Sequence, residues 1–245
     1  MYALLICDDP DETALLSLVL QRAGLAVTTG SHLQRVMETW AERPADIVVI
    51  SLSTPDPVSQ VRRVRAETDV PLVVVTGPLT EDGHYELLEA GGDMTLSRPF
   101  SSRLLIAQVR ALLRRSGGVP LATLPTLNLH GLTLDPATHQ AGVVDRPPQR
   151  LTHLEFRLLY TLMIHRGQVI PTETIVQRVW GYAGNGGSRE LVRGLISRLR
   201  SKVEIDPRQP RYIVTIPGIG YVFQGGEDEG EQDTGQAAAG ESAQD

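Results

Sequence analysis

The sequence predicts two domains of different class: an α/β domain with a doubly wound parallel sheet, followed by a smaller α+β domain. Through residues 1–115, short apolar runs alternate with amphipathic helical patterns, as in a parallel sheet covered by helices. Residues 126–224 instead give short strand patterns, three helical patterns and a final hairpin pattern. Between them, residues 116–125 contain Gly and Pro and little charge, which is typical of a linker.

Composition limits the class of protein. With 245 residues and 41% hydrophobic content, the chain can form two cores. The single cysteine, Cys7, excludes an intrachain disulfide and favours a reducing compartment. No apolar run could span a bilayer and no signal sequence opens the chain, so we expect a cytoplasmic protein. The six histidines lack ligand-like spacing, and we therefore expect no metal, no cofactor and no enzymatic activity.

The net charge of −6 is unevenly distributed. Residues 1–115 hold 11 Arg against 15 acids, and residues 225–245 hold 7 acids and no base, in a composition typical of a disordered tail. Residues 116–224 hold 12 Lys and Arg against 7 acids, a net charge of +5. A basic segment is attracted to the phosphates of nucleic acids. The second domain is therefore the candidate nucleic-acid binder.

The first domain should contain five buried strands and five helices. Because parallel strands place their functional loops at their carboxyl ends, a site is expected where these strands end. Asp8 and Asp9 follow the first strand, and Thr76 ends the fourth. The expected strands are Ala3–Cys7, Val27–Thr29, Ile47–Ile50, Leu72–Thr76 and Met94–Leu96, and the expected helices lie near Thr13–Ala23, Leu33–Ala41, Val58–Arg65, Tyr85–Ala90 and Arg103–Arg115.

The second domain is organised around a helix at Arg189–Val203. One face of this helix is apolar, and its other side is basic. An amphipathic helix with solvated arginines explains this pattern, and so does a helix that contacts DNA. The basic and polar positions are Arg189, Arg193, Ser197 and Arg200 in one sector and Arg198 and Lys202 at the opposite edge.

The sequence around this helix favours the DNA interpretation. A hairpin pattern at Arg211–Phe223 follows it. Upstream, Thr152 and Glu155 have capping-box spacing before a helix at Phe156–Ile164, and a second helix is expected at Glu173–Trp180. Residues 126–150 predict a small antiparallel sheet before these helices. Together they predict a winged helix, with the third helix in the major groove and the hairpin beside it.

These segments carry a family resemblance. LTHLEFRLL, VIPTETIVQRVWG, LISRLRSKV and YIVTIPGIGYVF resemble the effector domain of OmpR/PhoB-type response regulators, and residues 3–115 resemble their flavodoxin-like receiver domain. The resemblance implies a sequence-specific DNA-binding transcriptional regulator. It adds the hairpin residues Thr215 and Tyr221 to the DNA-contact candidates and suggests that the loop 181–188 touches RNA polymerase. It also implies a homodimer formed through the receiver helices near Tyr85–Ala90 and Arg103–Arg115.

The receiver part departs from the family pattern. Ser51 stands where the family has its phospho-accepting Asp, Arg98 stands at the Lys position, and Thr95 at the aromatic switch position. A serine hydroxyl is neither the nucleophile for acyl phosphate formation nor the carboxylate ligand that Mg²⁺ needs. We therefore expect a degenerate receiver that acts without aspartyl phosphorylation. In it, Arg98 should donate to Asp8 and Asp9, and Thr76 should bond Ser51.

Alternatives remain open at this point. Asp8 and Asp9 suit a helix N-cap with surface carboxylates as well as a residual metal site. The chain could also be a protein-interaction module that sequesters another regulator or RNA polymerase. A third possibility is a receiver that binds a small ligand or accepts a phosphate on Ser51.

Overall fold

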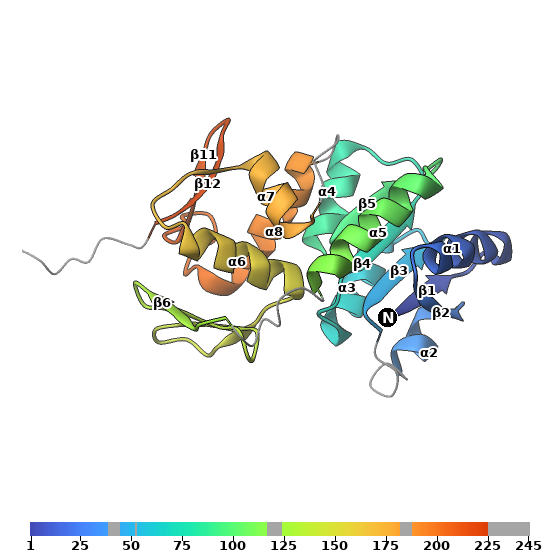
Figure 1. Ribbon diagram of the computed structural model, residues 1–245, viewed down its shortest axis with the longest axis horizontal. Helices are drawn as coiled ribbons and strands as arrows, with labels where there is room; N and C mark the ends of the chain where they lie inside the picture. Colours follow the sequence, from blue (N-terminus) through green and yellow to red (C-terminus); the bar gives the residue numbers. More distant parts are fainter. Residues whose placement is uncertain (39–44, 52, 117–123, 182–187, 225–245) are drawn as a thin grey trace, which may run out of the picture.

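The computed structural model describes residues 1–38, 45–51, 53–116, 124–181 and 188–224 (Figure 1). Most of the loop 181–188, most of the expected linker and the acidic tail therefore lie outside the described residues. Within the described residues, no helix combines the length and the apolar character needed to cross a bilayer.

The first part is the predicted doubly wound α/β domain. Its five strands are parallel in the order β2-β1-β3-β4-β5, and helices cover both faces of the sheet. The central strands β3 and β4 are buried along their whole length, as expected between two helical layers. The strands are β1 (Tyr2–Cys7), β2 (Ala26–Gly30), β3 (Ile47–Ser51), β4 (Leu72–Thr76) and β5 (Met94–Ser97), and the helices are α1 (Pro10–Arg22), α2 (Leu33–Glu38), α3 (Pro57–Glu67), α4 (Glu81–Glu89) and α5 (Ser102–Ser116).

Helix α1 begins one turn earlier than expected. Asp9 is its N-cap, with the side chain accepting a hydrogen bond from the backbone N–H of Glu12 at 2.7 Å. Pro10 fits the first helical turn because its ring fixes φ and its missing N–H leaves no donor unpaired. The expected start at Thr13 was wrong because the apolar periodicity begins only after this cap. The N-cap interpretation of Asp9 is confirmed.

The second part is the predicted α+β domain. The capping box of Thr152 and Glu155 is confirmed. Two short strands, β9 and β10, were not expected, because two residues are too few to show alternation. The elements are β6 (Leu127–Leu129), β7 (Leu132–Asp135), β8 (Gln140–Val143), β9 (Gln149–Arg150), α6 (His153–Ile164), β10 (Ile170–Pro171), α7 (Thr172–Val179), α8 (Ser188–Val203), β11 (Ile213–Ile216) and β12 (Gly220–Phe223).

A buried glutamate fixes the hairpin of β11 and β12 to the end of α8. Glu204 is 1% exposed and accepts hydrogen bonds from the backbone N–H groups of Arg211, Tyr212 and Ile213. These amide N–H groups supply the hydrogen-bond donors that a buried carboxylate needs. The hairpin therefore begins at a fixed distance from α8.

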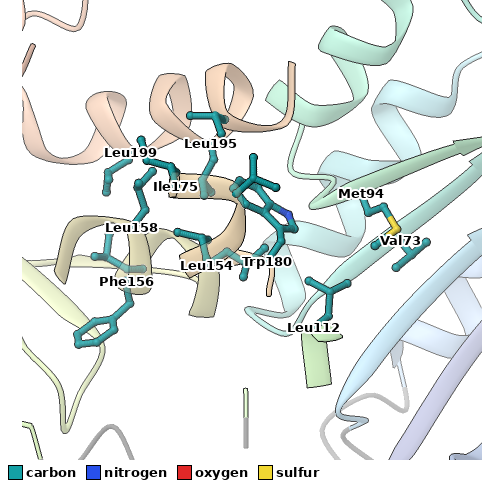
Figure 2. Close-up of a cluster of buried hydrophobic side chains, with 14 of the residues drawn as sticks. Val73, Met94, Leu112, Leu154, Phe156, Leu158, Ile175, Trp180, Leu195 and Leu199 are labelled. Atoms are coloured by element: carbon teal, nitrogen blue, oxygen red, sulfur yellow. The ribbon is translucent and has the colours of Figure 1, made fainter. Parts of the chain in front are cut away.

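The two parts share a continuous apolar core. Trp180, at the end of α7, lies between Leu154 and Leu195 of the second part and Met94 of β5 (Figure 2). Its ring is 1% exposed, and its Nε1–H donates to the backbone oxygen of Asp93 at 2.8 Å. A buried indole normally finds such a partner. Trp180 therefore links the two parts by packing and by a hydrogen bond.

Helices α4 and α8 lie side by side (Figure 1). A Cβ atom at Gly194 of α8 would lie 2.8 Å from the Cβ of Leu88 in α4. That distance is below ordinary van der Waals contact, so this approach depends on glycine at the crossing. The helix with the basic face is therefore packed against the first part.

We expect Gly220→Ala to destabilise the protein by about 1–3 kcal/mol, the range for overpacking a tight site. A Cβ there would lie 2.0 Å from the backbone oxygen of Ile170, across the β10–β12 pairing. Urea unfolding measures the loss. Gly142→Ala in β8 is the matched control, because its Cβ would meet only Thr133, at 4.0 Å. Equal stability of the two variants would contradict the clash.

Candidate DNA-binding surface and receiver site

The carboxyl end of β3 carries a buried hydroxyl. Ser51 is fully buried, and its Oγ donates to Oε2 of Glu12 at 2.7 Å. Oγ of Ser51 also accepts a hydrogen bond from Nη2 of Arg98 at 2.5 Å. These three side chains come from β3, α1 and the end of β5, and they meet at the edge of the sheet where a site was expected.

The ion pair in this site is bidentate. Nε of Arg98 lies 2.6 Å from Oε1 of Glu12, and Nη2 lies 2.6 Å from Oε2. Hydrogen bonding from Arg98 lowers the pKa of Glu12, and hydrogen bonding to Glu12 raises the pKa of Arg98. The fork of a guanidinium matches the two oxygens of a carboxylate. Glu12 and Arg98 therefore balance each other's charge without an external ion.

The other predicted members of this site have different partners. The expectation that Arg98 donates to Asp8 and Asp9 was wrong, because its described carboxylate partner is Glu12. Asp8 Oδ2 instead accepts the backbone N–H of Ser53 at 2.9 Å. The expected bond between Thr76 and Ser51 was also wrong, since the Thr76 hydroxyl donates to the backbone oxygen of Gly77 at 2.7 Å.

This donor set does not fit a magnesium ion. Mg²⁺ requires several oxygen ligands in octahedral geometry. Here the guanidinium of Arg98 is paired with the carboxylate of Glu12, and a permanent positive charge in that place opposes a divalent cation. Among the described residues, no group of three or more His, Cys, Asp or Glu side chains converges as metal ligands would.

The basic face of α8 turns toward α4 in this structure. The guanidinium of Arg193 lies over the ring of Tyr85, 4.5 Å from its centroid. The hydroxyl of Ser197 donates to Oε1 of Glu89 at 2.6 Å, and Tyr85 donates to the same oxygen at 2.7 Å. Arg189, at the start of the helix, is exposed.

Arg198 is held most firmly of these residues. Its Nη1 donates to the backbone oxygens of Leu88 and Gly92, the latter at 2.7 Å, and its Nη2 lies 3.0 Å from Oδ1 of Asp93. Its side chain is 10% exposed, and that of Asp93 is 1% exposed. Burial lowers the pKa of Arg198, and the charge of Asp93 opposes that shift. Removal of one partner from such a buried pair typically costs about 3–5 kcal/mol.

The ion pair of Arg198 belongs to a chain of alternating charges that crosses between the two parts. Asp93 also pairs with Arg65 of α3 at 2.6 Å, and Nε of Arg198 lies 3.4 Å from Glu155. Glu155 in turn pairs with Lys202 at 2.7 Å. Burial acts to raise the pKa of Glu155, but the positive charges of Lys202 and Arg198 outweigh it, and the net shift is downward. Each buried charge in this chain therefore has an opposite neighbour.

Arg200 points toward the hairpin. Its Nε and Nη2 donate to the backbone oxygen of Ile213, and Nη2 also reaches the Thr215 hydroxyl at 2.8 Å. Tyr221 on β12 is partly buried, and burial raises its pKa. The structure thus brings Arg193, Ser197, Arg200, Thr215 and Tyr221 together around one cavity. Arg189, Arg198 and Lys202 are not among the residues that line it.

Comparison with known proteins identifies this arrangement. Residues 146–223 match the family model described as "Transcriptional regulatory protein, C terminal". The "DNA-binding dual master transcriptional regulator RpaA" of Synechocystis is 32% identical over 234 residues, covering 93% of this chain and 96% of that protein. The chain belongs to the OmpR/PhoB family of transcriptional response regulators.

Other relatives agree with this assignment. The "DNA-binding response regulator MtrA" of Mycolicibacterium smegmatis is 32% identical over 222 residues, covering 89% of this regulator and 94% of the relative. Two solved mutants of RitR have the same fold, with TM-scores of 0.71 and 0.73 at 21% identity. Each covers 92% of this chain and 99% of its own. The regulator therefore has a receiver-like domain and a winged-helix DNA-binding domain, as the sequence predicted.

The packing of α4 corrects one expectation for this response regulator. We expected the receiver helices near Tyr85–Ala90 and Arg103–Arg115 to present a dimer face at all times. Instead, α4 packs along α8 and contributes Tyr85, Leu88 and Glu89 to that contact. Helix α8 of the same chain therefore covers this part of the expected dimer face.

Sequence reasoning missed several residues of the site. Glu12 lies 86 residues from Arg98 in the chain, and only the topology brings them together. Its place three residues after the cap Asp9 was a usable signal, because a side chain there lies at the strand ends. No comparable signal marked Tyr85 and Glu89 on α4 or Asp93 before β5, because their partners on α8 are distant in the sequence.

We expect Glu12→Gln to lower the free energy of unfolding by about 1 kcal/mol at pH 7, since the Glu12–Arg98 pair is partly solvated. The folded pKa of Glu12 is depressed, so its contribution is present above the unfolded pKa and is lost as pH falls through the folded value. The difference between wild type and variant in urea unfolding should therefore shrink below about pH 4. Asp11→Asn, on the exposed first turn of α1, is the control. A difference that grows in acid would contradict this assignment.

Proposed function

We propose that this regulator binds specific DNA sites while its receiver domain works without aspartyl phosphorylation. The single observation that carries the proposal is the bidentate pair of Arg98 and Glu12 with Ser51 bonded to both. Acyl phosphate formation requires a carboxylate nucleophile at the end of the central strand, and Ser51 supplies only a hydroxyl. Arg98 is also already neutralised, so it has no free charge to attract a phosphoryl group.

DNA contact is assigned to α8 and to the hairpin after it. In the proposed complex, Arg189, Arg193, Ser197 and Arg200 reach base edges or phosphates in the major groove, whereas Arg198 and Lys202 bind the backbone. Thr215 and Tyr221 on the hairpin bind the backbone beside the groove. The net charge of +5 over residues 116–224 supports this assignment. The names of RpaA and MtrA, which are described as DNA-binding, support it further.

The packing of α4 on α8 suggests how DNA binding is controlled. Arg193 and Ser197 contact Tyr85 and Glu89 of α4, and Arg198 pairs with Asp93 just before β5. The receiver domain and DNA therefore cannot occupy this face of α8 at once. The described conformation is the closed state in this proposal, and DNA selects an open state in which the domains separate. Signals that shift the balance between these states replace phosphorylation as the control.

Separation of α8 from α4 also exposes the receiver face that we expect to form the dimer. Once α8 leaves α4, the receiver face that includes α4 and α5 is free to pair with a second copy on two adjacent half-sites. A contact of the loop 181–188 with RNA polymerase remains part of the proposal, although most of that loop lies outside the described residues. We assign the regulator to the cytoplasm, because its proposed partner is chromosomal DNA.

Phosphorylation is tested directly. Full-length protein incubated with acetyl phosphate and Mg²⁺ should show no mass gain that hydroxylamine removes, because Ser51 cannot form an acyl phosphate. Intact-mass spectrometry with and without hydroxylamine gives the readout. A stoichiometric, hydroxylamine-sensitive gain would refute the proposal, whereas a stable gain at Ser51 would point to serine phosphorylation instead.

The proposed closed state is tested with substitutions in the receiver domain, so that the proposed DNA-contact residues of α8 and the hairpin remain unchanged. The double variant Tyr85→Ala, Glu89→Ala removes the partners of Arg193 and Ser197. We expect a roughly tenfold gain in DNA affinity, which corresponds to about 1.4 kcal/mol lost from the closed state. Electrophoretic mobility shift against the sites bound in a genome-wide map measures the gain.

The matched control is Glu86→Ala. This residue lies on the same helix, is exposed, and forms no side-chain hydrogen bond or ion pair with any of the described residues. It removes the same charge as Glu89→Ala, so a general electrostatic effect on DNA affinity would appear in both variants. If the double variant and the control bind DNA equally, α4 does not control access to α8.

A further inference from the structure

We infer that the cavity between α4, α8 and the hairpin is a binding site for a small organic anion with a flat ring, which holds the regulator closed. The cavity has a volume of about 310 Å³ and is lined by Tyr85, Arg193, Ser197, Arg200, Thr215 and Tyr221, with Ile196 and Pro207 completing the wall. The inference rests on the proposed function, because it assigns a ligand to the closed state.

The charge of the cavity determines the charge of the ligand. Two guanidinium groups line it, and no carboxylate is among the lining residues. Glu89 lies nearby, but one of its oxygens already accepts hydrogen bonds from Tyr85 and Ser197. Arg193 forms no hydrogen bond with any of the described residues, and Arg200 directs only Nε and Nη2 to the hairpin. An oxyanion between these two arginines would supply the acceptors that they lack.

The aromatic walls determine the shape of the ligand. Tyr85 comes from α4 and Tyr221 from β12, and Arg193 is already stacked on the ring of Tyr85. Arginine planes and tyrosine rings favour a flat partner. Burial raises the pKa of Tyr221. Within the described part of the chain, the hydroxyl of Tyr221 has no hydrogen-bond partner. A cavity of this size is at the lower end of ligand pockets, so it suits a compound of one or two rings.

The position of the cavity links the ligand to DNA binding. Tyr85 belongs to the receiver domain, and the other lining residues belong to the DNA-binding domain. The complete cavity therefore exists only while α4 lies against α8. A ligand that binds only the closed state stabilises it by mass action. The ligand also neutralises Arg193 and Arg200, two of the residues proposed to contact DNA.

Two probes of this chemical class distinguish the source of the anion. One is 4-hydroxybenzoate, an aromatic carboxylate, and the other is AMP, a nucleoside phosphate. Their neutral counterparts are 4-hydroxybenzamide and adenosine, and inorganic phosphate controls for a simple ionic effect. At ten times its Kd, an effective probe should raise the Tm of the full-length protein by about 3 °C. It should also weaken DNA binding about tenfold, because the two equilibria exclude each other.

Variants locate the site of binding. Tyr85→Ala should abolish the Tm shift, since it removes the receiver wall without changing a residue of the DNA-binding domain, and Glu86→Ala should retain it. The inference is overturned if neither probe shifts the Tm, if a neutral counterpart or inorganic phosphate gives the same shift, or if Tyr85→Ala responds as wild type.

The closing experiment separates this inference from the proposed function. If the Tyr85→Ala, Glu89→Ala variant gains DNA affinity but no probe binds, closure stands and the ligand site is refuted. If a probe binds in a Tyr85-dependent way but does not weaken DNA binding, the site stands and its control of DNA binding is refuted.

Discussion

The relative position of the two domains depends most on the buried pair of Arg198 and Asp93. Both side chains are nearly inaccessible to solvent, so their charges interact strongly and neither can be left alone without a large loss. Arg65 and Glu155 extend the pair on either side, and Trp180 packs beside it with a hydrogen bond to the Asp93 backbone. Because Arg198 and Asp93 come from different domains, they are paired only when α8 lies against the receiver, and this contact favours one orientation of the domains.

Strand β5 connects this contact with the receiver site. Asp93 directly precedes β5, and Arg98 directly follows it. The ring of His84 on α4 lies 2.9 Å from the Thr95 hydroxyl and 3.0 Å from that of Ser97, which ties α4 to the same strand. The Glu12–Arg98 pair is therefore separated by only one short strand, β5, from α4, the helix that covers α8. This path is the physical basis for expecting that any signal received at the strand ends would alter closure.

A receiver site whose charges are balanced by an internal ion pair differs from a site that is controlled by phosphate. In a site controlled by phosphate, charge arrives from outside and biases a two-state element. Here Glu12 supplies the negative charge from within the chain, so the site has the same charge balance at all times near neutral pH. Under the proposed function, control comes from groups that act on the contact between domains. Within that contact, Tyr85 and Arg193 line a cavity, and Glu89 is exposed beside them.

The sequence by itself determined the element order, the parallel sheet, the winged helix and the basic face of α8. Those features depend on local periodicity, capping and turn residues, and Thr152 with Glu155 shows how directly such a signal can be interpreted. Only the tertiary structure decided the partners of the charged groups. Arg98 had several carboxylates within the expected site, and its choice of Glu12 over Asp8 depends on where α1 begins relative to β5. Likewise, Arg198 was expected on the surface, but it is buried because α4 lies against α8. The periodicity of a helix shows which of its faces is apolar, but it does not show which other helix packs against it.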